Sequence, residues 1–237
     1  MNSIHRFALA AVVAVAWAPP IAAAQPGVTP PSSGCELHVY PTRYFRGSQR
    51  GALSGLGMLG GVIDADNNRD SVDFITDMMA KFLTPAAQMA QLRKANLLQA
   101  LNLPADTRVT VEAPLPNHED IKVDPAAKAR HDAMTAREKA GRRLTEATAA
   151  CYGELVVRNV FYQKATFYGT RIFAFFTYRH FRDGASAPRV SSGQVENPAP
   201  DFPFKGSGGS GEEARDALLR AYAADFEKWV SLKYQRD

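Results

Sequence analysis

Two long apolar runs in the C-terminal half of the chain constrain the fold more than any other part of the sequence. Residues 154–163 and 170–181 are rich in β-branched and aromatic residues, and a short turn-like stretch at 165–169 separates them. This pattern predicts a β-hairpin. In the second run, apolar residues occupy both sets of alternating positions, which is typical of a strand covered on both faces. We therefore expect this strand to lie centrally in a sheet.

The remaining apolar periodicities predict two more strands and four helices. The strands are expected at 35–41 and 108–112, and the helices from Asn68, from Thr84-Pro85 to before Pro104, over 125–150 and over 212–234. The resulting order is strand, two helices, strand, helix, strand, strand, helix. Such an order indicates an α+β fold in which helices pack on a sheet of about four strands. We expect one such domain over residues 35–237.

Three segments carry little apolar patterning. The segment 125–150 has high helix propensity, but Met134 and Leu144 are its only large apolar residues, so we expect an exposed polar helix. Residues 183–211 contain four prolines and a Gly-Ser run, which predicts a long loop. The segment 42–62 is glycine-rich, and turns with close packing are favoured there over a helix-pairing motif.

The N-terminus has the three parts of a secretory signal peptide. Arg6 lies in a basic start, residues 7–17 form an uncharged apolar run, and small residues end at Ala24. The apolar run is shorter than the ~20 residues that span a bilayer, so we expect cleavage rather than a transmembrane anchor. We accordingly expect residues 1–24 to be removed, residues 25–34 to form a flexible lead-in, and the protein to be periplasmic or secreted.

The two cysteines are consistent with export. Cys35 and Cys151 each begin an expected strand, and no other cysteine is present. In an oxidising compartment a disulfide between them would close a loop of about 100 residues or more, which is the favoured reading. The alternative is two free buried thiols.

Composition and motifs disfavour several functional classes. The formal net charge of +4 is small for a dedicated nucleic-acid binder. Residues 55–60 spell G-x-G-x-x-G, but no strand directly precedes them, so we expect no dinucleotide cofactor. His118-Glu119 lacks the second histidine of a zinc-protease motif, and we expect no metal. No catalytic motif is recognised, so the sequence favours a protein without enzymatic activity.

One aromatic and basic cluster is a candidate binding face. It consists of Tyr168, Arg171, Tyr178, Arg179 and His180, on and beside the second hairpin strand. Aromatic rings and arginines together bind bases or sugars by stacking. The alternative, which we favour, is a strand with core aromatic residues and ordinary surface arginines.

Three strings carry a resemblance to known proteins: CELHVYP at 35–41, CYGELVVRNVFY at 151–162 and FFTYRHF at 175–181. With the glycine-rich segment they resemble a group of exported proteobacterial-type proteins without assigned function. The element order is also loosely similar to small α+β envelope domains, such as the N-terminal domain of the Tol-system propeller protein and curli-secretion-type assembly factors. Those domains act through protein–protein contact.

Because the sequence shows no active-site motif but an exported fold with long polar segments, we expect a non-enzymatic binding or assembly factor whose partner is another envelope protein. The contact would use the sheet edge, the glycine-rich segment or the helix at 125–150. One alternative is a secreted hydrolase with an unrecognised site near His38 or His180. Another is a ligand-binding module that uses the aromatic face.

Overall fold

The computed structural model of the chain describes residues 34–50, 69–165, 169–182, 187–199 and 211–235. These residues belong to one compact unit, Pro31–Asp237. The expected signal peptide and almost all of the lead-in lie outside the described residues, as do Tyr168 and the glycine-rich stretch from residue 51 to residue 68.

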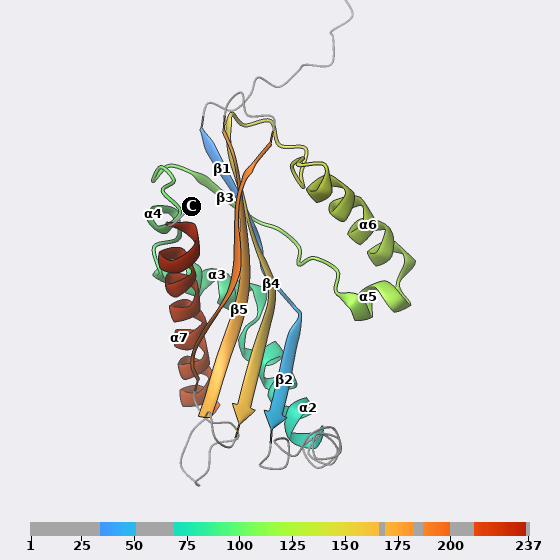
Figure 1. Cartoon of the computed structure of the whole chain (residues 1–237), viewed down its shortest axis with the longest axis vertical. Coiled ribbons are helices and arrows are strands. Elements are labelled where there is room, and N and C mark those ends of the chain that lie inside the picture. The colour runs from blue at the N-terminus through green and yellow to red at the C-terminus, as the bar shows by residue number, and fades with distance from the viewer. Residues whose placement is uncertain (1–33, 51–68, 166–168, 183–186, 200–210, 236–237) are drawn as a thin grey trace, which may run out of the picture. The chain divides into compact units, whose positions relative to one another are not determined.

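The fold is α+β, and its centre is a mixed six-stranded sheet (Figure 1). Its strands are β1 (Cys35–Tyr40), β2 (Phe45–Arg50), β3 (Arg108–Val111), β4 (Cys151–Ala165), β5 (Gly169–Phe181) and β6 (Arg189–Pro198). The order is β3-β1-β4-β5-β6, and β2 pairs with the distal half of β4. Strands β3, β1 and β4 are parallel, whereas β5 is antiparallel to both β4 and β6.

The expectation of about four strands is wrong, because β2 and β6 were not predicted. β2 lies in the glycine-rich segment, and β6 lies inside the expected loop at 183–211. Neither strand shows strong apolar alternation, so local pattern does not identify them. They form because β4 and β5 are long apolar strands whose backbone groups need partners along their whole length.

The β4–β5 hairpin is confirmed, with antiparallel pairing from Tyr152–Phe181 to Ala165–Gly169 that is interrupted by one bulge at Arg158. One face of β5 is fully buried at Ile172, Ala174, Phe176 and Tyr178. On the other face, Phe173 and Phe175 are only half-buried. The expectation that both faces of β5 are covered is therefore confirmed for the face that carries Phe176. On the opposite face, the strand is covered only in its last part, near Arg179.

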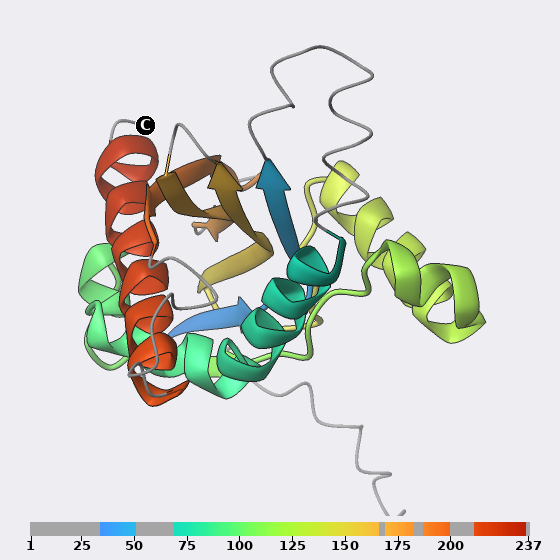
Figure 2. The ribbon, with the colours of Figure 1, turned by 90° about the horizontal axis from the view of Figure 1, so that it is seen from below.

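Helices cover the fully buried face (Figure 2). They are α2 (Arg69–Phe82), α3 (Pro85–Lys94), α4 (Leu97–Ala100) and α7 (Gly211–Trp229), which continues as a π-helical turn at Val230–Tyr234. The Thr84 side chain caps α3 by accepting from the Ala87 amide, and Pro85 occupies the first helical position, as predicted. The helix predicted over 212–234 is present as α7, and its Leu218, Tyr222, Phe226 and Trp229 are buried as one stripe.

The predicted helix at 125–150 is shorter than expected. The chain instead forms α5 (His118–Val123) and α6 (Pro125–Lys139), and Gly141 adopts φ +67° just after α6 ends. Glycine tolerates this left-handed conformation and therefore terminates the helix. Residues 142–150 are irregular and lead directly into β4.

A disulfide links Cys35 and Cys151, as predicted. The two residues are paired in register at the start of the parallel strands β1 and β4, with Cα atoms 4.5 Å apart. The free-thiol alternative is therefore wrong. The bridge fastens the two strands that carry most of the polar side chains described next.

Candidate functional site

The most distinctive feature of the fold is a two-helix arm. We define the arm as residues 113–145, which leave the sheet after β3 and return before β4. Figure 1 shows α5 and α6 on the side of the sheet away from α7. Neither helix contains a buried residue. Packing of side chains therefore contributes little to the stability of the arm. Its helices depend on local capping, and its position depends on contacts at its two ends.

Local capping begins both arm helices. The Asn117 side chain accepts from the amides of Glu119 and Asp120, and the Asp120 side chain accepts from the Asn117 amide, which completes a capping box. Asp124 caps α6 by accepting from the Ala126 amide. Each motif satisfies amides that a helix leaves unpaired in its first turn.

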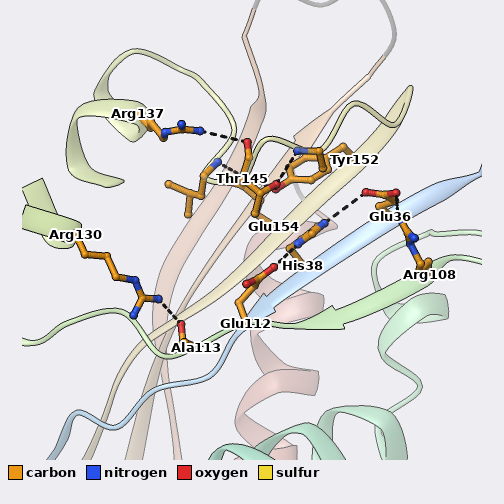
Figure 3. Close-up of polar contacts among 12 residues, drawn as sticks. Glu36, His38, Arg108, Glu112, Ala113, Arg130, Arg137, Thr145, Tyr152 and Glu154 are labelled. Carbon is orange, nitrogen blue, oxygen red and sulfur yellow. Dashed lines mark hydrogen bonds and ion pairs between the residues drawn. The ribbon is translucent and has the colours of Figure 1, made fainter. Parts of the chain in front are cut away.

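The first end of the arm meets a row of charged side chains on β1 and β3 (Figure 3). His38 Nδ1 lies 2.6 Å from Glu112 Oε1, and His38 Nε2 lies 3.5 Å from Glu36 Oε2. Arg108 forms an ion pair with Glu36. His38 therefore bridges two carboxylates and links β1 to Glu112, the residue directly before the arm.

The first end is also tied back by α6. Arg130 Nη2 donates to the carbonyl of Ala113 at 2.9 Å, so the returning helix contacts the departing chain (Figure 3). A small apolar cluster lies beneath the arm, where half-buried Leu115 and Met134 pack on Tyr40, Leu144 and Val156. Tyr40 and Val156 are paired in register and lie on the opposite face from the main core.

The second end of the arm is held by Glu154, which is fully buried on β4. Its Oε1 accepts from the amide of Leu144 and from the Tyr152 hydroxyl at 2.9 Å. Its Oε2 accepts from Arg179 Nη1 at 2.6 Å, and Arg179 Nη2 donates to the Arg142 carbonyl at 2.7 Å. Both oxygens of the Glu154 carboxylate thus accept hydrogen bonds. Glu154 binds the arm directly through the Leu144 amide and indirectly through Arg179, which donates to the Arg142 carbonyl.

Two further contacts complete this second end. The hydroxyls of Thr145 and Tyr152 are 2.8 Å apart, and Arg137 pairs with Glu146 just beyond the arm. The Arg143 guanidinium lies 4.5 Å from the centre of the Tyr152 ring, which is within the range of a cation–π contact. The irregular residues after α6 therefore follow the sheet because polar side chains of β4 and β5 bind their backbone.

Burial governs the titration of this cluster. Burial raises the pKa of Glu154 above its usual value, while the Leu144 amide, Arg179 and the Tyr152 hydroxyl act in the opposite direction. Burial also raises the pKa of Tyr40 and Tyr152, and the charge of Glu154 adds to both increases. Neither tyrosine hydroxyl is therefore an available base at neutral pH.

The side chains of this cluster are bound to one another and to the backbone of the arm. Both nitrogens of His38 face carboxylates, so neither is directed at a nucleophile as a general base would be. The described residues also contain no group of three or more His, Cys, Asp or Glu side chains placed to hold a metal ion. What the polar cluster does chemically is to fix both ends of the arm.

A pocket of about 210 Å³ opens between the arm and the sheet. It forms where both neighbouring strands are irregular: residues 41–44 separate β1 from β2, and β4 has a bulge at Arg158. The Thr42 hydroxyl donates to the Arg158 carbonyl at 3.3 Å across this break. Bulges of this kind often redirect side chains near functional sites.

Side chains from the sheet and from the arm line the pocket together. Tyr44 comes from the strand break, His118 from α5, and His131 and Met134 from α6. An ion pair between Arg158 and Glu138 crosses from the β4 bulge to α6. The pocket is therefore amphipathic, and its shape depends on the position of the arm.

The five residues of the sequence-predicted binding face do not share one surface. Arg171 and Arg179 lie on the arm side of β5, whereas Tyr178 and His180 lie on the helical side, and Tyr168 is outside the described residues. Tyr178 and Arg179 are buried, and His180 is stacked on Tyr178 with ring centres 5.8 Å apart. Burial lowers the pKa of His180, and Arg182 and Arg189 lower it further.

Sequence reasoning missed the residues that hold the arm. Glu36, Glu112 and Glu154 were not singled out, although Glu154 interrupts the apolar string CYGELVV. A carboxylate in the middle of a buried strand costs free energy unless it is paired, and that is the signal that identifies it. The partner Arg179 is likewise embedded in an apolar run, so the pair is detectable once the hairpin register is known.

No helix among the described residues is long and apolar enough to cross a membrane. Comparison with known proteins gives no assignment: no protein-family model matches the chain, and no curated protein matches it.

Proposed function

We propose that the protein is a non-enzymatic binding or assembly factor of the cell envelope, and that it binds another envelope protein through the arm. The observation that carries the proposal is the contrast between the arm and its attachments. The helices of the arm bury no residue, yet the second end is fixed by the buried carboxylate of Glu154, and the first end is held by the contact of Arg130 with Ala113 beside the His38–Glu112 pair.

The exposed surface of the arm supports a binding role. Val123, at the junction of α5 and α6, is 83% exposed and is the most exposed large apolar residue of the described chain. It borders a second hollow, of about 440 Å³, that includes Pro114 and Ala127. Exposed apolar side chains gain free energy when a partner covers them, so the junction of the two helices is a suitable contact point.

The disulfide supports the proposed location. Bridges such as Cys35–Cys151 form and persist in oxidising compartments, which include the bacterial periplasm. This agrees with a signal peptide cleaved after Ala24, which we propose on sequence grounds.

Site-specific photocrosslinking in intact cells tests this function. A photoreactive residue is placed at Val123 or at Ala129 in α6, both of which are exposed. The matched control places it at Glu227, an exposed position on α7. We expect one recurrent protein adduct from both arm positions and none from Glu227.

Two outcomes contradict the proposal. The arm positions yield no protein adduct although the labelled protein is exported and disulfide-bonded, or Glu227 yields the same adduct as Val123. A single contact variant, Val123→Asp, then serves as an independent check, because it removes the apolar contact without altering any buried group.

A further inference from the structure

A groove of about 630 Å³ lies on the helical side of the molecule, between α3 and α7. One side of α3 lines it through Thr84, Ala87, Gln91 and Lys94, which recur at helical spacing. Figure 2 shows the two helices side by side on the opposite side of the sheet from the arm. This groove is therefore separate from the proposed partner-binding surface.

The groove is strongly cationic. Lys81, Lys94, Arg215 and Arg220 line it, and Asp216 is the only carboxylate among its described lining residues. Asp216 lies 3.4 Å from Arg215, its neighbour in sequence. Within the described part of the chain, the other three cations form no ion pair, so their charges are available to a ligand.

A largely buried glutamine that lines the groove is a second, independent observation. Gln91 lines the groove and is only 7% exposed, yet its side chain has no hydrogen-bond partner among the described residues. Gln88, one turn earlier, shows the usual arrangement. Its amide accepts from the Thr42 amide at 3.0 Å and donates to the carbonyls of Thr42 and Leu83, each at 2.7 Å. The amide atoms of Gln91 are not among the fully enclosed polar atoms of the described residues, so they open onto the groove, where they can hydrogen-bond to a bound group.

We propose that this groove binds a small anionic ligand carrying at least two phosphate groups. Lys94 and Arg220 supply charge, the planar Arg guanidinium suits bidentate contact with a phosphate, and the Gln91 amide donates a hydrogen bond to a ligand oxygen. Its volume falls within the range of small-molecule sites and exceeds what one phosphate fills. Phosphate is favoured over carboxylate because a terminal phosphate carries about 1.5 to 2 negative charges, and four cationic side chains line this one groove.

Titration calorimetry of the full disulfide-bonded protein with tripolyphosphate tests the site. The double variant Lys94→Gln/Arg220→Gln removes two exposed charges, and Gln91→Met removes the amide. The matched control, Lys139→Gln/Arg182→Gln, removes the same charge from exposed positions elsewhere. We expect saturable binding that weakens about tenfold or more in the groove double variant, severalfold in Gln91→Met, and little in the control.

Two probes, lipid vesicles and tripolyphosphate, distinguish between the possible sources of the phosphate. If a lipid headgroup is the ligand, the protein binds vesicles that contain cardiolipin, whose headgroup carries two phosphates, but not vesicles of phosphatidylcholine alone, and tripolyphosphate displaces the vesicles. If the ligand is a free polyphosphate compound, tripolyphosphate binds and vesicles do not. Either result supports the site, provided that the groove double variant no longer binds the same probe.

The proposal is overturned if tripolyphosphate and vesicles both fail to bind, or if citrate binds as tightly as tripolyphosphate. It is also overturned if the control double variant loses as much affinity as the groove variant, because that result means general charge attraction. Thermal melting of each variant shows whether the fold is retained. The double variant changes only exposed side chains, so it keeps the test interpretable even if Gln91→Met is less stable.

Discussion

Glu154 and Arg179 form an ion pair across the β4–β5 ladder in which neither side chain reaches solvent: Oε2 and Nη1 are 2.6 Å apart, and the side chains are 0% and 3% exposed. Because the same arginine also donates to the Arg142 carbonyl, this one pair connects the sheet to the last residues of the arm.

Removing one member of this pair is expected to be costly. Arg179→Met leaves the Glu154 carboxylate buried without its cation, and we expect the free energy of unfolding to fall by about 3–5 kcal/mol. Urea denaturation measures the change. The double variant Glu154→Gln/Arg179→Met recovers part of the loss, since no buried charge remains unpaired. Lys128→Met, in an exposed ion pair with Asp132, is the control and has little effect. A loss no larger than that of the control contradicts the structural role given to the pair.

Asp225 makes stability depend on pH. The side chain is fully buried on α7, it accepts one hydrogen bond from Asn197, and burial raises its pKa to about 8. In the unfolded chain the group loses its proton near its ordinary value of about 4, so the folded state binds more protons between these two values. Stability therefore falls as the pH rises from about 4 to about 8, by up to about 1.4 kcal/mol per pH unit.

The variant Asp225→Asn removes this titration. We expect it to be more stable than the parent protein at pH 8 and to show a flatter profile of unfolding free energy against pH. The control Asp106→Asn changes an exposed carboxylate and leaves the profile as it is. Equal pH profiles for Asp225→Asn and the parent protein would show that this carboxyl group does not govern the pH dependence.

Gly47 is required by the approach of α2 to β2. A Cβ atom at this position would lie 2.6 Å from the Val72 carbonyl oxygen, which belongs to helix backbone and cannot move easily. We expect Gly47→Ala to lower the free energy of unfolding by about 1–3 kcal/mol. Gly34→Ala, where a Cβ meets nothing within 4 Å, is the matched control. Chemical denaturation compares the two, and equal stabilities would contradict the close contact.

The Cys35–Cys151 bridge closes a loop with a sequence separation of 116 residues. On the chain-entropy account, a loop of this size contributes about 4–5 kcal/mol to stability. We expect Cys35→Ala/Cys151→Ala to lose stability of this order, measured by denaturation under non-reducing conditions. Adding reductant to the parent protein produces a similar loss but does not change the double variant. A parent protein insensitive to reductant would contradict this contribution.

The parts of the fold that sequence predicted are those whose side chains repeat. The hairpin, the start of α3 at Thr84 and the buried stripe of α7 all follow from local patterns. β2 and β6 were missed because pairing with longer neighbours, not their own residues, makes them strands. The helix expected over 125–150 is polar as predicted, but it ends early at Lys139, before Gly141, and the residues that follow are held by Glu154 on β4, which lies later in the sequence.

The candidate site was harder to predict than the fold. His38, Glu112 and Glu36 come together only because β1 and β3 are parallel neighbours, and that pairing joins segments about seventy residues apart. The bulge of β4 at Arg158 shifts the register of every later pair in the hairpin. Neither fact leaves a local signature, so the pocket between the arm and the sheet depends on tertiary structure alone.

The position of the disulfide also determines what happens when the chain is cut. Every residue of the arm lies between Cys35 and Cys151, so a protease that nicks α5 or α6 opens a covalently closed ring instead of releasing a fragment. The two pieces separate only after reduction. In a compartment that contains proteases and lacks reductants, the most exposed part of this protein can be cleaved while all of its residues remain in one molecule.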